Sequence, residues 1–336
     1  MGSDPVKKFC YNKAIFFRRY EPLTGFLTAG IIRTALEVGL VYSLVALSLF
    51  ISYSILNICD LSTDGCYTLG CAVGAVVTIA GHPFLAIFAA MAAGVCSGFV
   101  TAFLQTKLGV ESILAGIIVN TGLYTVNLAV MGFSSNVSIF GTDTIFTLFG
   151  KLSSSKAFAS WSKLILLAAV VLVVCLLIRW FLSTTLGLSI RATGDSPAMV
   201  RASSINPAFT ITVGLCVANA ITGLAGCLIA QYNKTCDINL GTGMVTIALA
   251  SLVIGETLFG KRKMMARIFG MVVGSCLYRF IISIALRLNV PTEAFKLVSA
   301  VIVAVAIAAP RAKELVAFKH KQMNAIRERK SMQGGR

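Results

Sequence analysis

Charged residues are scarce in this sequence of 336 residues: they make up 12% of it, whereas hydrophobic residues make up 57%. The net charge of +16 does not point to nucleic acid, because the basic residues form short clusters beside apolar segments. Pro83–Thr106 and Pro207–Tyr232 contain no charge at all, and each exceeds the roughly 20 residues that cross a bilayer as an α-helix. The sequence therefore predicts an all-α, polytopic membrane protein.

Histidine and paired cysteine are also lacking. His82 and His320 are the two histidines, and neither belongs to an H-E-x-x-H pattern. The ten cysteines occur singly, without any C-x-x-C pair, so they are interpreted as small apolar residues of the helix interior. We therefore expect no metal site, no disulfide framework and no enzymatic activity in this chain.

A nucleotide-binding loop is almost present but incomplete. Gly255–Arg262 reads GETLFGKR, and the P-loop pattern requires a serine or threonine after the lysine to hold Mg²⁺. Arg262 stands at that position, and the stretch closes an apolar segment. We interpret it as the end of a membrane span with its cytoplasmic charge anchor, and we expect no ATP site in this chain.

Nine apolar segments are candidate spans. They are residues 38–56, 65–80, 83–105, 112–131, 164–182, 209–230, 241–255, 268–286 and 294–309. The basic tail keeps the C-terminus in the cytoplasm, and alternation then places the basic loops 183–207 and 261–267 inside as well. The basic residues before Val38 fall on the wrong side, so either this tail is an exception or Leu23–Glu37 forms an extra span or interfacial elbow. We expect eight to ten spans in all.

The chain also repeats itself. A helix followed by DLSTDGCYTLGCAVG at Asp60–Gly74 is echoed by a helix followed by DINLGTGMVTIALA at Asp237–Ala250. By alternation the first break faces inward and the second outward, which makes the repeats inverted, a pattern typical of transporters. Three parts result: residues 1–37 as a basic tail, 38–310 as the membrane domain with halves 38–160 and 161–310, and 311–336 as a basic cytoplasmic tail.

The cytoplasmic loop 183–207 contains signals for a short helix. Ser196 suits an N-cap, Pro197 suits the first helical position, and Pro207 prevents continuation. A small apolar face formed by Ala198, Met199 and Ala202 can enter a groove on another protein. The alternative is an ordinary capped helix at the membrane surface.

Polar residues within the spans are candidates for a translocation path, because lipid cannot satisfy them. Arg279 lies well inside a span, and we favour an internal acid, Glu37 or Glu256, over a solute carboxylate as its partner. The remaining candidates fall at the two breaks or at i, i+4 and i+7 on one helix face: Asp60, Asp64, Asp237, Asn239, Asn120, Tyr124 and Asn127. For the four residues at the breaks the alternative role is helix capping, and for the last three it is hydrogen bonding between helices.

Four segments resemble permease subunits of bacterial ABC importers. They are GLVYSLVALSLFISYSILNICDLSTDGCYTLG at Gly39–Gly70, KLGVESILAGIIVNTGLYTVNLAVMG at Lys107–Gly132, GLSIRATGDSPAMVRASSINP at Gly187–Pro207 and ITGLAGCLIAQYNKTCDINLGTGMVTIALASLVIGETLFG at Ile221–Gly260. The family is the branched-chain amino acid and ribose type, and the likeness is greatest to its branch proposed for tryptophan and tyrosine. It covers Gly39–Ala312 in order.

The resemblance implies a multi-pass subunit of type II importer architecture in the bacterial inner membrane. Its implied partners are a second copy of itself, two cytoplasmic ATPase subunits that hold ATP and Mg²⁺, and an extracytoplasmic solute-binding lipoprotein. The implied cargo is a small solute, an amino acid, with aromatic amino acids among the candidates. Residues expected to couple to the ATPase are Arg191, Gly194, Asp195, Ser196, Pro197, Ala198, Met199, Arg201, Ala202 and Asn206. The alternative function is a secondary transporter or channel driven by an ion gradient.

Overall fold

The computed structural model describes residues 29–151, 156–260 and 263–287, together with the single positions 300, 301, 304 and 308. The longer helices are α2 (Ala29–Leu49) with its π-helical continuation η2 (Phe50–Ile55), α4 (Pro83–Thr106), α5 (Ser112–Val130), α7 (Lys156–Ser183), α10 (Pro207–Asn233) and α12 (Met264–Arg287). The shorter ones are α3 (Thr63–Ile79), α6 (Ile145–Lys151), α8 (Thr185–Asp195), α9 (Pro197–Ala202) and α11 (Met244–Phe259), and two strands are β1 (Asn136–Ser138) and β2 (Thr235–Asp237).

The expectation of an all-α, multi-pass membrane protein is confirmed. Among the described residues, six helices are long and apolar enough to cross a membrane, and α3 and α11 are shorter apolar helices. These eight correspond to the first eight predicted spans. The ninth, residues 294–309, lies outside the described residues apart from four single helical positions.

The start of the first span was predicted too late. The helix α2 begins at Ala29 instead of Val38, so residues 29–37 form neither a separate span nor an elbow and do not belong to the tail. Arg33 and Glu37, which made this stretch look too polar, form an i,i+4 ion pair at 2.9 Å on the same helix. Their mutual neutralisation lets both charges remain in the helix.

Helix α10 is the centre of the bundle. In its most apolar window 83% of residues are buried, compared with 22% for α7, which lies at the periphery. Glycines allow α3 and α4 to approach the α10 backbone closely: a Cβ on Gly70 would collide with the Gly223 carbonyl, and one on Gly94 would collide with the Asn219 carbonyl. Such small-residue contacts are how helices pack within a membrane, where the hydrophobic effect does not drive their association.

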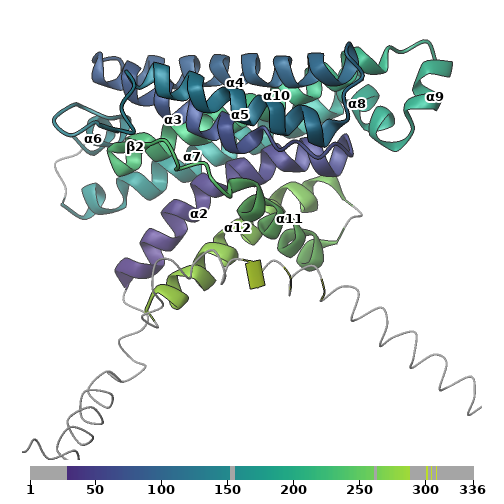
Figure 1. Ribbon diagram of the computed structural model, residues 1–336. Coiled ribbons are helices and arrows are strands. Elements are labelled where there is room, and N and C mark those ends of the chain that lie inside the picture. The colour runs from purple at the N-terminus through teal and green to yellow at the C-terminus, as the bar shows by residue number, and fades with distance from the viewer. Residues whose placement is uncertain are drawn as a thin grey trace, which may run out of the picture.

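The two shorter helices begin near the middle of α10 and run in opposite directions (Figure 1). The Cys66 thiol of α3 reaches the Asn219 carbonyl at 3.4 Å, and further along Gly74 faces Cys227, so α3 runs parallel to the second half of α10. The helix α11 also begins beside α3, where Val245 N–H meets Asp64 at 2.8 Å, but it ends beside η2, where Ser54 meets Glu256. The inverted arrangement of two interrupted helices is therefore present.

A small sheet and a short helix close one end of the bundle. The strands β1 and β2 pair antiparallel, with Asn136 opposite Asp237. This pairing and α6 lie within or beside the predicted outer segments, where no helix or strand was predicted. At the opposite end lie α8 and α9, as Figure 1 shows. The first break, residues 56–62, leads from the α8 end to mid-depth, and the second, residues 238–243, leads there from the sheet end.

We predict that Gly70→Ala lowers the stability of the folded protein by about 1–3 kcal/mol, because the new methyl group must displace the α10 backbone. Gly122→Ala is the matched control: an added Cβ there meets no atom within 4 Å, and alanine favours a helix over glycine. The measurement is the midpoint of thermal unfolding in detergent. Equal midpoints for the two variants would contradict the packing described for α3 and α10.

Candidate functional site

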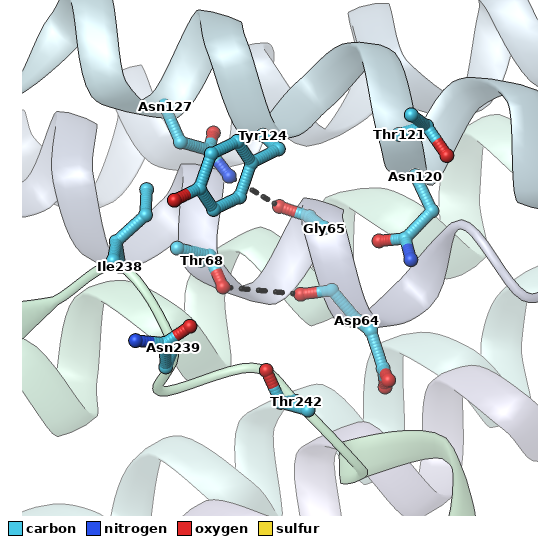
Figure 2. Close-up of a pocket in the computed structure, with 10 residues that line it drawn as sticks. All are labelled: Asp64, Gly65, Thr68, Asn120, Thr121, Tyr124, Asn127, Ile238, Asn239 and Thr242. Atoms are coloured by element: carbon cyan, nitrogen blue, oxygen red, sulfur yellow. Dashed lines mark hydrogen bonds between the residues drawn. The ribbon is translucent and has the colours of Figure 1, made fainter.

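A polar cavity of about 250 Å³ lies where α3, α5 and the second break meet (Figure 2). Five of the eight residues predicted for a translocation path line it: Asp64, Asn120, Tyr124, Asn127 and Asn239. Three of them come from one face of α5, at the i, i+4 and i+7 spacing that the sequence shows. Because α3 and α11 both begin beside this cavity, it occupies the junction of the two inverted halves.

The Asp64 carboxylate joins the two halves directly. Its Oδ2 accepts a hydrogen bond from the Gly243 N–H at 2.9 Å, and its Oδ1 accepts one from the Val245 N–H at 2.8 Å. A carboxylate at this position caps the first turn of α11 and complements its positive dipole end. Capping, which was one of two roles expected for Asp64, is thus present, and the same residue also lines the cavity.

Thr68 lies one turn after Asp64 and was missed by the sequence reasoning. Its hydroxyl donates to the Asp64 carbonyl at 3.2 Å and accepts from the Gly241 N–H at 3.2 Å. Its signal was the spacing of four residues from Asp64, which places both side chains on one helix face. Thr121 and Thr242, which also line the cavity, had no such signal.

The α5 side of the cavity is built around Asn127. Only 1% of this residue is exposed, and its Nδ2 donates to the Gly65 carbonyl at 3.1 Å, so the expected bond between helices exists. Its Oδ1 has no hydrogen-bond partner among the described residues. Gly65 is required for the close approach of α5, since a Cβ there would lie 2.7 Å from Asn120 Oδ1. Tyr124 is 52% exposed and stands at the cavity's edge.

Two of the predicted path residues serve the backbone outside the cavity. Asp60 is buried and accepts from the Ser62 N–H at 2.9 Å, the Ser62 hydroxyl at 2.6 Å and the Asn219 amide at 2.9 Å. Asp237 closes a turn by accepting from the Asn239 N–H at 2.7 Å. Asp60 thus holds the backbone just before α3, whereas Asp237 stabilises a turn and caps no helix.

The prediction that Glu37 or Glu256 pairs with Arg279 was wrong. Glu37 pairs with Arg33 and accepts from the Tyr232 hydroxyl at 2.8 Å, and Glu256 pairs with Arg267 at 2.9 Å. The Arg279 guanidinium lies instead 5.2 Å from the ring centroid of Tyr42, and no carboxylate within the described ranges reaches it. Arg279 also does not line the cavity. The position of Arg279 in the sequence could not show which basic side chain lies next to which acidic one.

The inner end of α11 is fixed by a compact polar cluster of Glu256, Arg267 and Ser54. The Ser54 hydroxyl donates to Glu256 at 2.8 Å and also contacts Arg267 at 2.5 Å, while the Arg267 guanidinium stacks 4.8 Å from the Phe50 ring centroid. The side chains of Glu256 and Arg267 are 12% and 17% exposed. This cluster connects α11, α12 and the π-helix η2.

The predicted short helix is α9, which has six residues instead of about eight. Ser196 caps it, with its hydroxyl accepting from the Met199 N–H at 3.4 Å, and the chain turns at Ser204 with a φ of 59°. The preceding residues Arg191–Asp195 belong to helix α8 and not to a loop, since Thr184 caps that helix upstream. Asn206 then caps α10 by accepting from the Ala208 N–H at 3.0 Å.

The surface of α9 has the predicted character. Val200 is 2% exposed and attaches the helix to the bundle, whereas Met199 is 71% exposed and Ala198 and Ala202 are exposed beside it. Arg191, Asp195, Pro197 and Arg201 are exposed as well. Gly194 is different, because it lies against the backbone of η2: a Cβ there would collide with the Ile55 carbonyl.

Residues 31–307 match the family described as branched-chain amino acid transport system, permease component. The chain belongs to this permease family. It is accordingly a multi-pass protein of the inner membrane. Among curated relatives, the permease is 33% identical to a tyrosine transport system permease protein of Clostridioides difficile over 79% of this chain and 86% of that protein.

Two further relatives of the permease differ in what their names state. An uncharacterised protein of Rickettsia prowazekii is 30% identical over 85% of this chain and 99% of its own length. A ribose import permease protein of Escherichia coli is 27% identical over 74% of this chain and 75% of that protein. No solved structure matches the permease.

We predict that Glu256→Ala destabilises the permease by about 3 kcal/mol, because it leaves the largely buried Arg267 charge without its carboxylate. The control is Lys151→Ala, which breaks the ion pair with Asp143 whose side chains are 66% and 54% exposed. The control should unfold almost as the unmodified protein does. Thermal midpoints measured in the same detergent compare the two, and equal midpoints would show that the cluster adds nothing to stability.

Proposed function

We propose that this permease is the membrane subunit of an ATP-driven importer that carries a small solute, an amino acid, into the cell. The observation that carries the proposal is the polar cavity at mid-depth, at the meeting point of two half-helices that run in opposite directions. Sites of this kind in transporters bind the solute near the middle of the bilayer, at the interface of the repeats. The Clostridioides difficile relative, whose name states tyrosine transport, supports an aromatic amino acid as cargo.

The energy enters through α9, which docks into a separate ATPase subunit. Its exposed apolar face, Ala198, Met199 and Ala202, suits a groove on a partner protein, and the adjacent Arg191 and Arg201 supply polar contacts at the rim. ATP and Mg²⁺ are held by that ATPase. The permease itself provides the path and carries out no chemical step.

Movement of α9 reaches the cavity through a short series of contacts. Gly194, near the end of α8, lies against the Ile55 carbonyl at the end of η2. Ser54 of η2 contacts Glu256 at the inner end of α11, and the other end of α11 is held by Asp64 at the cavity. A pull on α9 therefore shifts α11 relative to α3, and this shift changes access to the cavity.

The complete importer contains a second copy of the permease, two ATPase subunits and an extracytoplasmic solute-binding lipoprotein. The outer end formed by β1, β2 and α6 is the side that faces the lipoprotein. Its surface is polar in part: Lys151 donates to Asp143 at 2.7 Å and lowers the pKa of that exposed carboxyl. Exposed Phe133 and Phe140 add apolar contact area next to it.

We predict that Met199→Glu abolishes ATP-dependent uptake, because a charge on the exposed face of α9 cannot enter an apolar groove of the ATPase. Uptake is measured in proteoliposomes that contain the permease, its ATPase and the binding protein. Met265→Glu is the control, since Met265 is also an exposed methionine, in the first turn of α12 next to the Arg267 cluster. It should leave uptake within about twofold of the unmodified protein.

The physical association is tested separately by co-purification. The permease and Met265→Glu should retain the ATPase subunit through affinity purification, and Met199→Glu should lose it while unfolding at the unmodified temperature. Full uptake by Met199→Glu would remove α9 as the coupling element. Uptake that persists without any ATPase and follows an ion gradient would replace the proposal by a secondary transporter.

A further inference from the structure

The mid-depth cavity carries one negative charge and no positive charge. Asp64 is the only charged residue among the described residues that line it, and no lysine, arginine or histidine within those ranges forms an ion pair with it. Two backbone N–H groups bind its oxygens, whereas a carboxylate accepts about four hydrogen bonds. The Asp64 carboxylate therefore keeps acceptor capacity toward the cavity.

A second polar residue, Asn127, belongs to the same lining. Asn127 is 1% exposed, and its Oδ1 has no donor among the described residues although its Nδ2 is bonded to Gly65. A buried acceptor without a donor costs about 1–3 kcal/mol. Figure 2 shows Asn127 on the α5 side and Asp64 on the α3 side of the lining, and the Asp64 carboxylate points toward the segment that contains Thr242.

We propose that Asp64 is the residue that makes this cavity select a solute with a primary ammonium group over a neutral sugar. The inference rests on the proposed function, since it takes the cavity to lie on the solute's path. An ammonium group supplies the positive charge that a carboxylate at mid-membrane requires, and its N–H donors can fill the acceptor positions of Asp64 that the backbone leaves open. A neutral sugar supplies hydroxyl donors but leaves the charge of Asp64 uncompensated.

The family alone does not make this distinction, because relatives of this chain are named for tyrosine transport and for ribose import. The cavity volume of about 250 Å³ suits one small solute, being just below the range of about 300–1,000 Å³ typical of pockets for drug-sized ligands. Tyr124, Asn120 and Asn239 offer the additional polar contacts that orient such a solute. The charge of Asp64 is the property of the cavity that distinguishes solutes with an ammonium group from neutral sugars.

The test is equilibrium binding to the permease–ATPase complex in lipid nanodiscs, without the binding protein. The probes are L-tyrosine, its decarboxylated amine tyramine, its deaminated acid 3-(4-hydroxyphenyl)propanoate, and D-ribose; L-leucine with its corresponding amine and acid forms a second set. We expect the amino acids and amines to bind at least about tenfold more tightly than the acids and ribose. This comparison uses the unmodified chain and does not depend on any variant folding.

Asp64→Asn should weaken amine binding by about tenfold or more, because it keeps the size of the side chain but removes the charge, together with one of the two acceptors that cap α11. Asp64→Glu should retain preference for amines over acids. Asp143→Asn is the control, because it neutralises an exposed acid at the outer end, outside the cavity lining, and its binding should be unchanged. The midpoints of thermal unfolding, measured for all three variants, check that the binding comparison is made between folded proteins.

Equal binding of amines and acids, binding of ribose alone, or binding of no probe would overturn the role of Asp64. The same complexes with the binding protein then report ATP-dependent uptake in proteoliposomes. Retained uptake with no preference for the ammonium group means that this inference fails and the importer function stands. Loss of both uptake and ATPase association in the unmodified chain means that the proposed function itself has failed.

Discussion

Two helices of this permease begin in the middle of the bundle, and their exposed backbone ends impose the main constraint on the structure. At membrane depth no water satisfies the N–H groups of a helix start, so the protein must supply acceptors itself. Asp64 does this for α11 with two short hydrogen bonds, and Asp60 does it for the residues before α3. Both carboxylates lie in one short segment, Asp60–Asp64. This segment therefore supplies the acceptors at the start of both half-helices.

The backbone proximity that this arrangement requires depends on glycine. Gly241 lies so close to the Asp64 carbonyl that a Cβ would collide with it, and Gly65 gives room to Asn120 of α5. The cavity is therefore not a packing defect. It is bounded on three sides by segments that small residues bring together, and its polar lining cannot face lipid.

The sequence predicted the parts of this structure that depend on local signals. Long apolar runs indicated eight helices, the caps Ser196 and Pro197 indicated α9, and the spacing of Asn120, Tyr124 and Asn127 indicated a polar face that now borders the cavity. The parts it could not predict join distant residues. Arg267 pairs with Glu256 and also contacts Ser54, which lies 213 residues earlier in the chain, and Arg279 lies over the ring of Tyr42. Such partners are decided by the tertiary arrangement of the helices.

The sheet at the outer end has a consequence for biosynthesis. Asn136–Ser138 pairs with Thr235–Asp237, so the first strand leaves the ribosome roughly 100 residues before this partner exists. Helix α10 must cross the bilayer before the strands can pair, because β2 follows it directly and lies at the outer end. The outer surface of the permease is thus completed only after the central helix has crossed the bilayer, and a nascent chain halted earlier lacks the paired strands.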